Sequence, residues 1–171
     1  DQQGGWGMSD EFRLGDAHFT DMTAVIGDLE KRFPGVPLFL VGTSRGTISA
    51  AALGAKLGQR TAGVVLTSSM FRQAPKNSQE PGPGLSRFEF TTIKIPLLFV
   101  HHVSDQCQST PYGDAARLSD KYPLITVFGG ASPQSGPCEA FSQHGFLGKE
   151  SDTVEQIVNW MLKRPMNHEV K

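Results

Sequence analysis

Short apolar segments that alternate with helical segments constrain the fold of this chain more than any other feature. Four runs have the length and composition of buried strands: residues 36–41, 61–66, 96–101 and 124–128. Helical spacing or composition marks four further stretches: residues 17–32, 47–57, 111–121 and 151–163. Strands that alternate with helices predict an α/β fold, with a parallel sheet of about four strands flanked by helices.

The rest of the chain is expected to form loops within one domain that spans residues 1–171. Residues 1–16 begin in a Gly-rich stretch and are interpreted as an N-terminal loop. Residues 69–94 are rich in Pro and Gly and are interpreted as a surface loop, too short for a helical lid. The length is that of one ordinary domain, so no second domain is expected.

Charge and hydropathy exclude two classes of partner. The formal net charge is -1, with acidic and basic residues mixed along the chain, so no basic field would attract nucleic acid. The longest apolar run, residues 37–41, is far too short to cross a membrane, and the polar start lacks a signal-peptide pattern. Since the sequence starts without Met in a loop-like stretch, we expect a mature or trimmed form of a longer protein.

The strongest chemical signal is Gly42-Thr43-Ser44-Arg45-Gly46, which lies directly between a predicted strand and a predicted helix. In a G-x-S-x-G turn the serine adopts a strained backbone conformation, and small residues let the strand and helix approach. The pattern predicts Ser44 as a nucleophile raised above the sheet. It also predicts the backbone N–H of Arg45 as one oxyanion-hole donor at the start of a helix. The Arg45 side chain could bind an acidic substrate group or form a surface ion pair.

A serine hydroxyl is a weak nucleophile, so it requires a base and a carboxylate that orients the base. Asp105 follows the third predicted strand by four residues, where loops gather at the carboxyl edge of a parallel sheet. His144 follows the last predicted strand and precedes the last helix. We therefore predict Asp105 as the acid and His144 as the general base.

Other titratable residues are less well placed. Asp114 and Asp120 lie within a helical pattern, and His168 lies in a tail that we expect to fray. His101 and His102 are adjacent on a strand and point to opposite faces, so both cannot bind one metal ion. No third ligand has a suitable spacing, and we expect at least one of these two histidines to pack beside the site.

With these motifs, and with His144-Gly145-Phe146, the chain from residue 17 onward resembles the α/β-hydrolase superfamily in its lidless, esterase-like form. Ser44, Asp105 and His144 follow one another in the order of that family's triad. Within the superfamily the chain is similar to exported bacterial hydrolases. The resemblance implies a serine hydrolase that cleaves carboxylic esters through an acyl-enzyme, without a cofactor, and the lack of a lid helix favours small or medium esters. A peptidase or acyltransferase, or an inactive hydrolase-like interaction module, remains an alternative.

The chain departs from the family at its amino end, where the family has further strands and a second oxyanion donor. In the family's strand order a missing strand pairs beside the strand of the nucleophile, so residues 36–41 would form a bare apolar edge. An amino-terminal partner chain or a homodimer could cover that edge. Alternatively, the Gly4-Gly5-Trp6-Gly7 loop could supply the second donor.

The two cysteines are either free buried thiols or one disulfide, and position favours the disulfide. Cys107 is two residues after Asp105, and Cys138 is six residues before His144. A bridge would tie the two loops together and add roughly 3 to 4 kcal/mol of stability in the chain-entropy estimate. It would also indicate an extracytoplasmic compartment, periplasmic or secreted.

Overall fold

A computed structural model describes residues 7–73 and 82–171. Within these residues, five parallel strands form one sheet in the order β1-β2-β3-β4-β5. They are β1 (Phe39–Thr43), β2 (Gly63–Thr67), β3 (Leu97–His102), β4 (Leu124–Val127) and β5 (Glu169–Val170). The predicted α/β fold with a parallel sheet is confirmed, and β1 to β4 overlap the four predicted runs. The fifth strand, in the tail that was expected to fray, is an addition.

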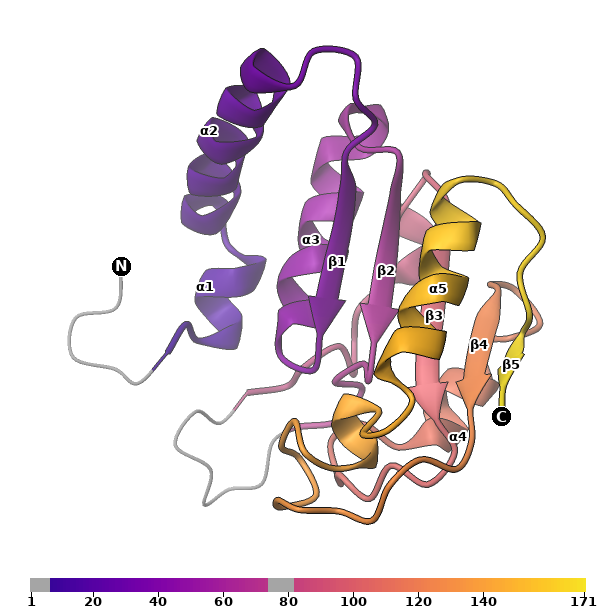
Figure 1. Ribbon diagram of the computed structural model, residues 1–171. Coiled ribbons are helices and arrows are strands. Elements are labelled where there is room, and N and C mark those ends of the chain that lie inside the picture. Colours follow the sequence, from indigo (N-terminus) through magenta and orange to yellow (C-terminus); the bar gives the residue numbers. More distant parts are fainter. Residues whose placement is uncertain (1–6, 74–81) are drawn as a thin grey trace.

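Helices cover both faces of the sheet (Figure 1). The α-helices are α1 (Asp10–Leu14), α2 (Asp16–Arg32), α3 (Gly46–Leu57), α4 (Tyr112–Ala116) and α5 (Glu150–Met161). Short 3-10 turns are η1 (Gly58–Arg60), η2 (Phe90–Thr92) and η3 (Gln143–Gly145). In Figure 1, α3 lies on one face and α5 on the other, while α1 and α2 stand beside the edge formed by β1.

Two helices differ from their predictions. The N-terminal loop prediction is wrong for Asp10–Leu14, because the Ser9 hydroxyl accepts a hydrogen bond from the Phe12 N–H (3.1 Å) and caps a short helix. The helix predicted over residues 111–121 is shorter, and α4 ends at Ala116. In the predicted loop 69–94, the described part contains only η2, and residues 74–81 lie outside the described residues.

Alternating side chains of the strands divide the core into two layers. Val64 and Leu66 of β2 belong to the cluster on the α3 face, whereas Val65 between them belongs to the cluster on the α5 face with Ile157. β2 and β3 are buried at every position, which explains why their sequences are continuous apolar runs. Both strands therefore end in a buried environment at the carboxyl edge of the sheet.

The two outer strands differ in exposure. Among the described residues, β1 has a strand neighbour on one side only, and Val41 is 54% exposed, as the sequence predicted for a bare apolar edge. At the other edge β5 pairs with β4, and Val170 is buried against the core. Across the described ranges, none of the helices combines the length and apolar character needed to cross a membrane.

Candidate active site

Ser44 lies in a sharp turn between β1 and α3. Its φ of 51° is the left-handed conformation that a strained serine elbow requires. Its N–H donates to the carbonyl oxygen of Thr67 (3.0 Å), and its carbonyl accepts from the N–H of Thr47 (3.0 Å). A Cβ on Gly42 would lie 2.4 Å from the carbonyl oxygen of Gly46, so glycine is required at Gly42. A Cβ on Gly46 would meet nothing within 4 Å, so the steric need for a small residue falls on one side of the serine only.

Asp105 and His144 are in direct contact. Nδ1 of His144 lies 3.0 Å from Oδ2 of Asp105, and their side chains are 4% and 0% exposed, respectively. Oδ1 of Asp105 accepts a hydrogen bond from the N–H of Cys107 (2.9 Å). Because the carboxylate holds Nδ1, the imidazole can carry its proton there and leave Nε2 as the basic atom.

Thr110 is a third member of this cluster that the sequence did not reveal. Its hydroxyl donates to Oδ2 of Asp105 (2.8 Å) and lies 3.2 Å from Nδ1 of His144. The residue is fully buried. No motif marks it, since Thr and Ser are common in loops before a helix.

The end of β2 connects Ser44 to His144. Thr67, the last residue of β2, accepts the N–H of Ser44, and the next residue, Ser68, donates its hydroxyl to the carbonyl oxygen of His144 (2.7 Å). Ser68 is fully buried and has a positive φ of 45°. The nucleophile turn and the histidine loop are therefore fixed to adjacent residues of one strand end.

No hydrogen bond joins the Ser44 hydroxyl to His144. Nε2 of His144 is buried and has no hydrogen-bond partner in the part of the chain that the structure describes. A buried nitrogen without a partner is unusual and energetically costly, so it marks a site where a further group is expected to bind. In free enzymes the hydrogen bond between nucleophile and base is often long and tightens when substrate binds.

His101 and His102 lie on opposite sides of β3, as expected. His101 is fully buried, accepts a hydrogen bond from the N–H of Ser69 (2.8 Å) and stacks on Phe71 at 5.4 Å. Burial lowers the pKa of His101 to about 3, so it is neutral at physiological pH. The described ranges contain no group of three or more His, Cys, Asp or Glu that could hold a metal ion.

His102 supports the loop of the candidate acid. Its Nδ1 accepts the N–H of Ser104 (3.0 Å), and its Nε2 lies 3.0 Å from the carbonyl oxygen of Gly129. Burial also lowers the pKa of His102. This histidine therefore ties the chain just before Asp105 to the chain after β4.

The other residues considered as acid or base do not take part in the contact between Asp105 and His144. Asp114 forms ion pairs with Arg72 (2.8 Å) and Arg117 (2.6 Å). Asp120 is exposed. Nδ1 of His168 lies 3.1 Å from the carbonyl oxygen of Leu124, the first residue of β4. His168 is therefore at the amino ends of the strands, whereas Ser44 is at their carboxyl ends.

A disulfide links Cys107 to Cys138, with 4.7 Å between their Cα atoms. Cys107 donates its N–H to Asp105, and Cys138 belongs to the segment that leads to His144. The bridge therefore joins the loop of the candidate acid to the loop of the candidate base, as position had suggested.

The side chain of Arg45 forms an ion pair with Asp10 of α1 (2.7 Å). Asp10 is only 2% exposed, and its second oxygen accepts the N–H of Gly84 (2.8 Å). The observed pair supports the ion-pair interpretation of Arg45 over a role in binding substrate, although the pair is partly buried rather than superficial. The sequence missed Asp10 because α1 was interpreted as a loop.

Residues 1–104 match the family described as serine aminopeptidase, S33, whose members are α/β-hydrolases. The chain belongs to this family. The match includes the Ser44 turn but ends one residue before Asp105, so Asp105 and His144 are candidates on the geometry above alone. A search of curated proteins found no match to the sequence.

Three solved structures with a similar fold are compared with this chain. Est1E from Butyrivibrio proteoclasticus has a TM-score of 0.61 at 15% identity, over 85% of this chain and 68% of that protein. Monoacylglycerol lipase from Paleococcus ferrophilus has a TM-score of 0.57 at 15% identity, over 91% of this chain and 76% of that protein. A pyrethroid hydrolase from Sphingobium faniae JZ-2 has a TM-score of 0.51 at 13% identity, over 91% and 79% of the two chains. At these identities the likeness shows the α/β-hydrolase fold.

Proposed function

We propose that this α/β-hydrolase is a serine esterase in which Ser44 is the nucleophile, His144 the general base and Asp105 the residue that orients the base. The contact between Nδ1 of His144 and Oδ2 of Asp105 carries the proposal, because it leaves Nε2 as the basic atom. The positive φ of Ser44 and its attachment to the same strand end as His144 support it.

The proposed reaction has two steps, acylation of Ser44 and hydrolysis of the acyl-enzyme. The Ser44 oxygen attacks the acyl carbon while Nε2 of His144 takes its proton, and the alcohol then leaves with that proton. Water repeats the attack with the same base, which releases the acid and restores Ser44. The backbone N–H of Arg45 is proposed as one donor to the oxyanion, and a missing second donor would slow turnover by about 10²–10³-fold.

One observation supports esters over amides, and a second bears on the size of the substrate. Two of the similar structures are titled as a monoacylglycerol lipase and a pyrethroid hydrolase, although the family is named for an aminopeptidase. In its described part the loop 69–94 has no lid helix, and this supports small or medium substrates over long-chain lipids. A peptidase or acyltransferase would use the same three residues, and an interaction module would use none of them.

We also propose that the free edge of β1 pairs with an extended strand from an amino-terminal partner chain. A cavity of about 410 Å³ runs between α2 and β1 and is lined mainly by apolar residues that include Ile26, Leu29 and Val41. The unpaired backbone of an edge strand is a ready site for another strand. Light scattering tests the competing occupant, since a stable dimer of this chain alone would mean that a second copy covers the edge.

The disulfide supports a location outside the cytoplasm. Disulfides persist in oxidising compartments and are rare in the reducing cytosol. We propose a periplasmic or secreted enzyme. Expression with and without export to the periplasm, followed by counting free thiols in the denatured protein, tests this. Two free thiols in the exported protein would contradict it.

The decisive experiment is labelling with a fluorophosphonate probe, read by intact mass. We expect one adduct on the unmodified chain, none on Ser44→Ala, and labelling at least 10³-fold slower on His144→Ala. Ser86→Ala, on an exposed loop, is the control and should label normally. Absence of an adduct on the folded chain would contradict the esterase proposal for this chain and favour the interaction module.

The substrate class is tested on a pair of matched substrates. Hydrolysis of p-nitrophenyl acetate well above that of alanine p-nitroanilide supports an esterase. The reverse order, with both activities lost in Ser44→Ala, would identify a peptidase instead.

A further inference from the structure

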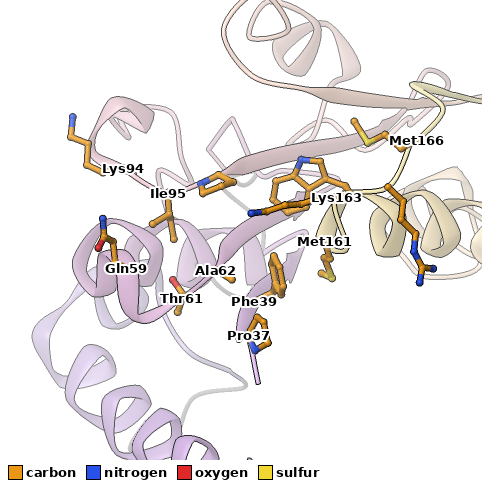
Figure 2. Close-up of a pocket in the computed structure, with 13 residues that line it drawn as sticks. Pro37, Phe39, Gln59, Thr61, Ala62, Lys94, Ile95, Met161, Lys163 and Met166 are labelled. Atoms are coloured by element: carbon orange, nitrogen blue, oxygen red, sulfur yellow. The ribbon is translucent and has the colours of Figure 1, made fainter. Parts of the chain in front are cut away.

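A second cavity lies at the amino ends of the strands, whereas Ser44 lies at their carboxyl ends. It has a volume of about 750 Å³ and is bounded by the amino ends of β1, β2 and β3 and by the carboxyl end of α5 (Figure 2). β1 starts with Phe39 at this cavity and ends beside Ser44, so the length of the sheet separates the two places. The catalytic proposal uses none of the residues that line it.

Most of the cavity wall is apolar. The apolar side chains that line it include Phe39, Ile95, Pro96, Trp160, Met161 and Met166. The rings of Phe39 and Trp160 meet edge to face, with centroids 6.1 Å apart. A Cβ on Gly63 would lie 2.9 Å from the Trp160 ring and 3.2 Å from Phe39, so this glycine lets both rings lie against the sheet. The wall is therefore a shaped apolar surface.

All the charged residues that line the cavity are cationic: Lys94, Lys163 and Arg164. No Asp or Glu lines it, and none of the three cations forms an ion pair within residues 7–73 and 82–171. In Figure 2 the side chain of Lys163 reaches across the cavity, and Lys94 lies at its rim. Three unpaired cations around an apolar surface favour an anionic ligand.

The backbone at the end of α5 directs Lys163 to this place. Lys163 has a φ of 54°, a conformation that helices usually give to glycine after their last turn. The N–H of Lys163 donates to the carbonyl oxygen of Trp160 (3.0 Å). The N–H of Arg164 donates to the backbone carbonyl oxygen of Asn159 (2.8 Å). A lysine in a glycine position costs stability, and strained residues of this kind are concentrated at functional sites.

We propose that this cavity binds an amphipathic carboxylate, with its hydrocarbon chain against Phe39, Trp160 and Met161 and its carboxylate at Lys163 and Arg164. The volume lies within the range of small-molecule sites. Three like charges disfavour a cationic ligand. Gln59 and Thr61 are the main neutral polar side chains of the wall, too few to recognise a sugar or a base. The site is separate from Ser44, so it does not depend on the proposed esterase activity.

Trp160 provides a direct measurement of binding. The chain has two tryptophans, Trp6 and Trp160, so Trp6→Phe leaves Trp160 as the single reporter in the full-length chain. Titration with decanoate below its micelle concentration should give a saturable change in Trp160 emission. Lys163→Gln with Arg164→Gln should weaken binding about tenfold or more, since it removes both cations at the carboxylate. Lys31→Gln, on the exposed surface of α2, is the matched control and should change nothing.

Two further ligands separate charge from hydrophobicity. Decyltrimethylammonium has the chain with the opposite charge, and acetate has the carboxylate without the chain, so neither should bind at the concentration where decanoate saturates. Equal binding of both decyl compounds, an unchanged affinity in the double Gln variant, or no response to decanoate by the folded protein would each overturn the proposal. Binding to anionic vesicles without binding to free decanoate would identify a membrane-contacting surface instead.

Discussion

The two sides of the candidate active site differ in how firmly the chain holds them. Around His144 and Asp105, four features act together: the Thr110 hydroxyl, the Ser68 hydroxyl, the Cys107 N–H and the Cys107–Cys138 disulfide. The side chains of the candidate acid and base are almost fully buried within this chain. Their geometry therefore does not depend on any other molecule.

Ser44 lies on the open side. It follows β1, the edge strand, where Val41 is exposed and where the chain provides no further strand in its described part. Its backbone is held by hydrogen bonds alone, from its N–H to Thr67 and from the N–H and hydroxyl of Thr47 to its carbonyl oxygen, with no covalent link. The difference indicates that the candidate acid and base are preorganised, whereas the Ser44 side is where an additional strand or a substrate would complete the proposed site.

Removal of the carboxylate charge should have the largest effect. Asp105→Asn keeps the shape but loses the acceptor that holds Nδ1–H of His144, so the rate of ester hydrolysis or probe labelling should fall about 10³–10⁴-fold. Initial rates against p-nitrophenyl acetate measure this. Asp114→Asn removes the rival carboxylate, whose partners are Arg72 and Arg117, and should leave the rate nearly unchanged. A comparable loss in both variants would mean that Asp105 is not the acid.

The placement of Asp105 and His144 near one another was predictable from the sequence, because strand ends and chain order locate them. β1 to β4 were predictable because their buried runs are apolar at nearly every position. β5 was not, since Glu169–Val170 is too short to show a pattern. Thr110 and Ser68 were not predictable either, because their contacts with His144 join residues that are 34 and 76 positions apart. A hydroxyl in a loop gives no sign of which distant residue it will meet.

Removal of the disulfide tests how far the enclosed side depends on a covalent link. Cys107→Ser with Cys138→Ser opens a loop with a sequence separation of 31 residues. The chain-entropy estimate predicts a loss of roughly 3 to 4 kcal/mol in the free energy of unfolding. Urea unfolding of this variant, and of the unmodified protein with and without dithiothreitol, measures it. A loss below about 1 kcal/mol would show that hydrogen bonds alone hold the two loops together.

Loss of the Thr110 hydroxyl should have a smaller effect on the same side. Thr110→Val keeps the volume but removes the hydrogen bond to Asp105, which retains its bond from the Cys107 N–H. We expect kcat to fall about tenfold, equivalent to one good hydrogen bond, with little change in KM. Thr110→Ser restores the hydroxyl and should recover most of the rate. Equal rates in the Val and Ser variants would limit Thr110 to a packing role.

The smallest effect on stability is expected for a substitution at the exposed edge of β1, beside Ser44. A negligible change there would itself show that the edge is uncovered. Val41 is 54% exposed, so Val41→Lys should change the free energy of unfolding by no more than about 0.5 kcal/mol. Leu40, the adjacent residue, is 8% exposed on the α3 face, and Leu40→Ala should cost about 2–5 kcal/mol. Urea unfolding at two protein concentrations measures both and separates folding from association.

A cost near 2 kcal/mol for Val41→Lys is the value for a buried valine, so it would show that the edge is already covered in solution. If that cost rises with protein concentration, the cover is a second copy, and if it does not, the cover comes from the same chain. A negligible cost at both concentrations leaves the edge free for a partner strand, which is what the open side of the site requires.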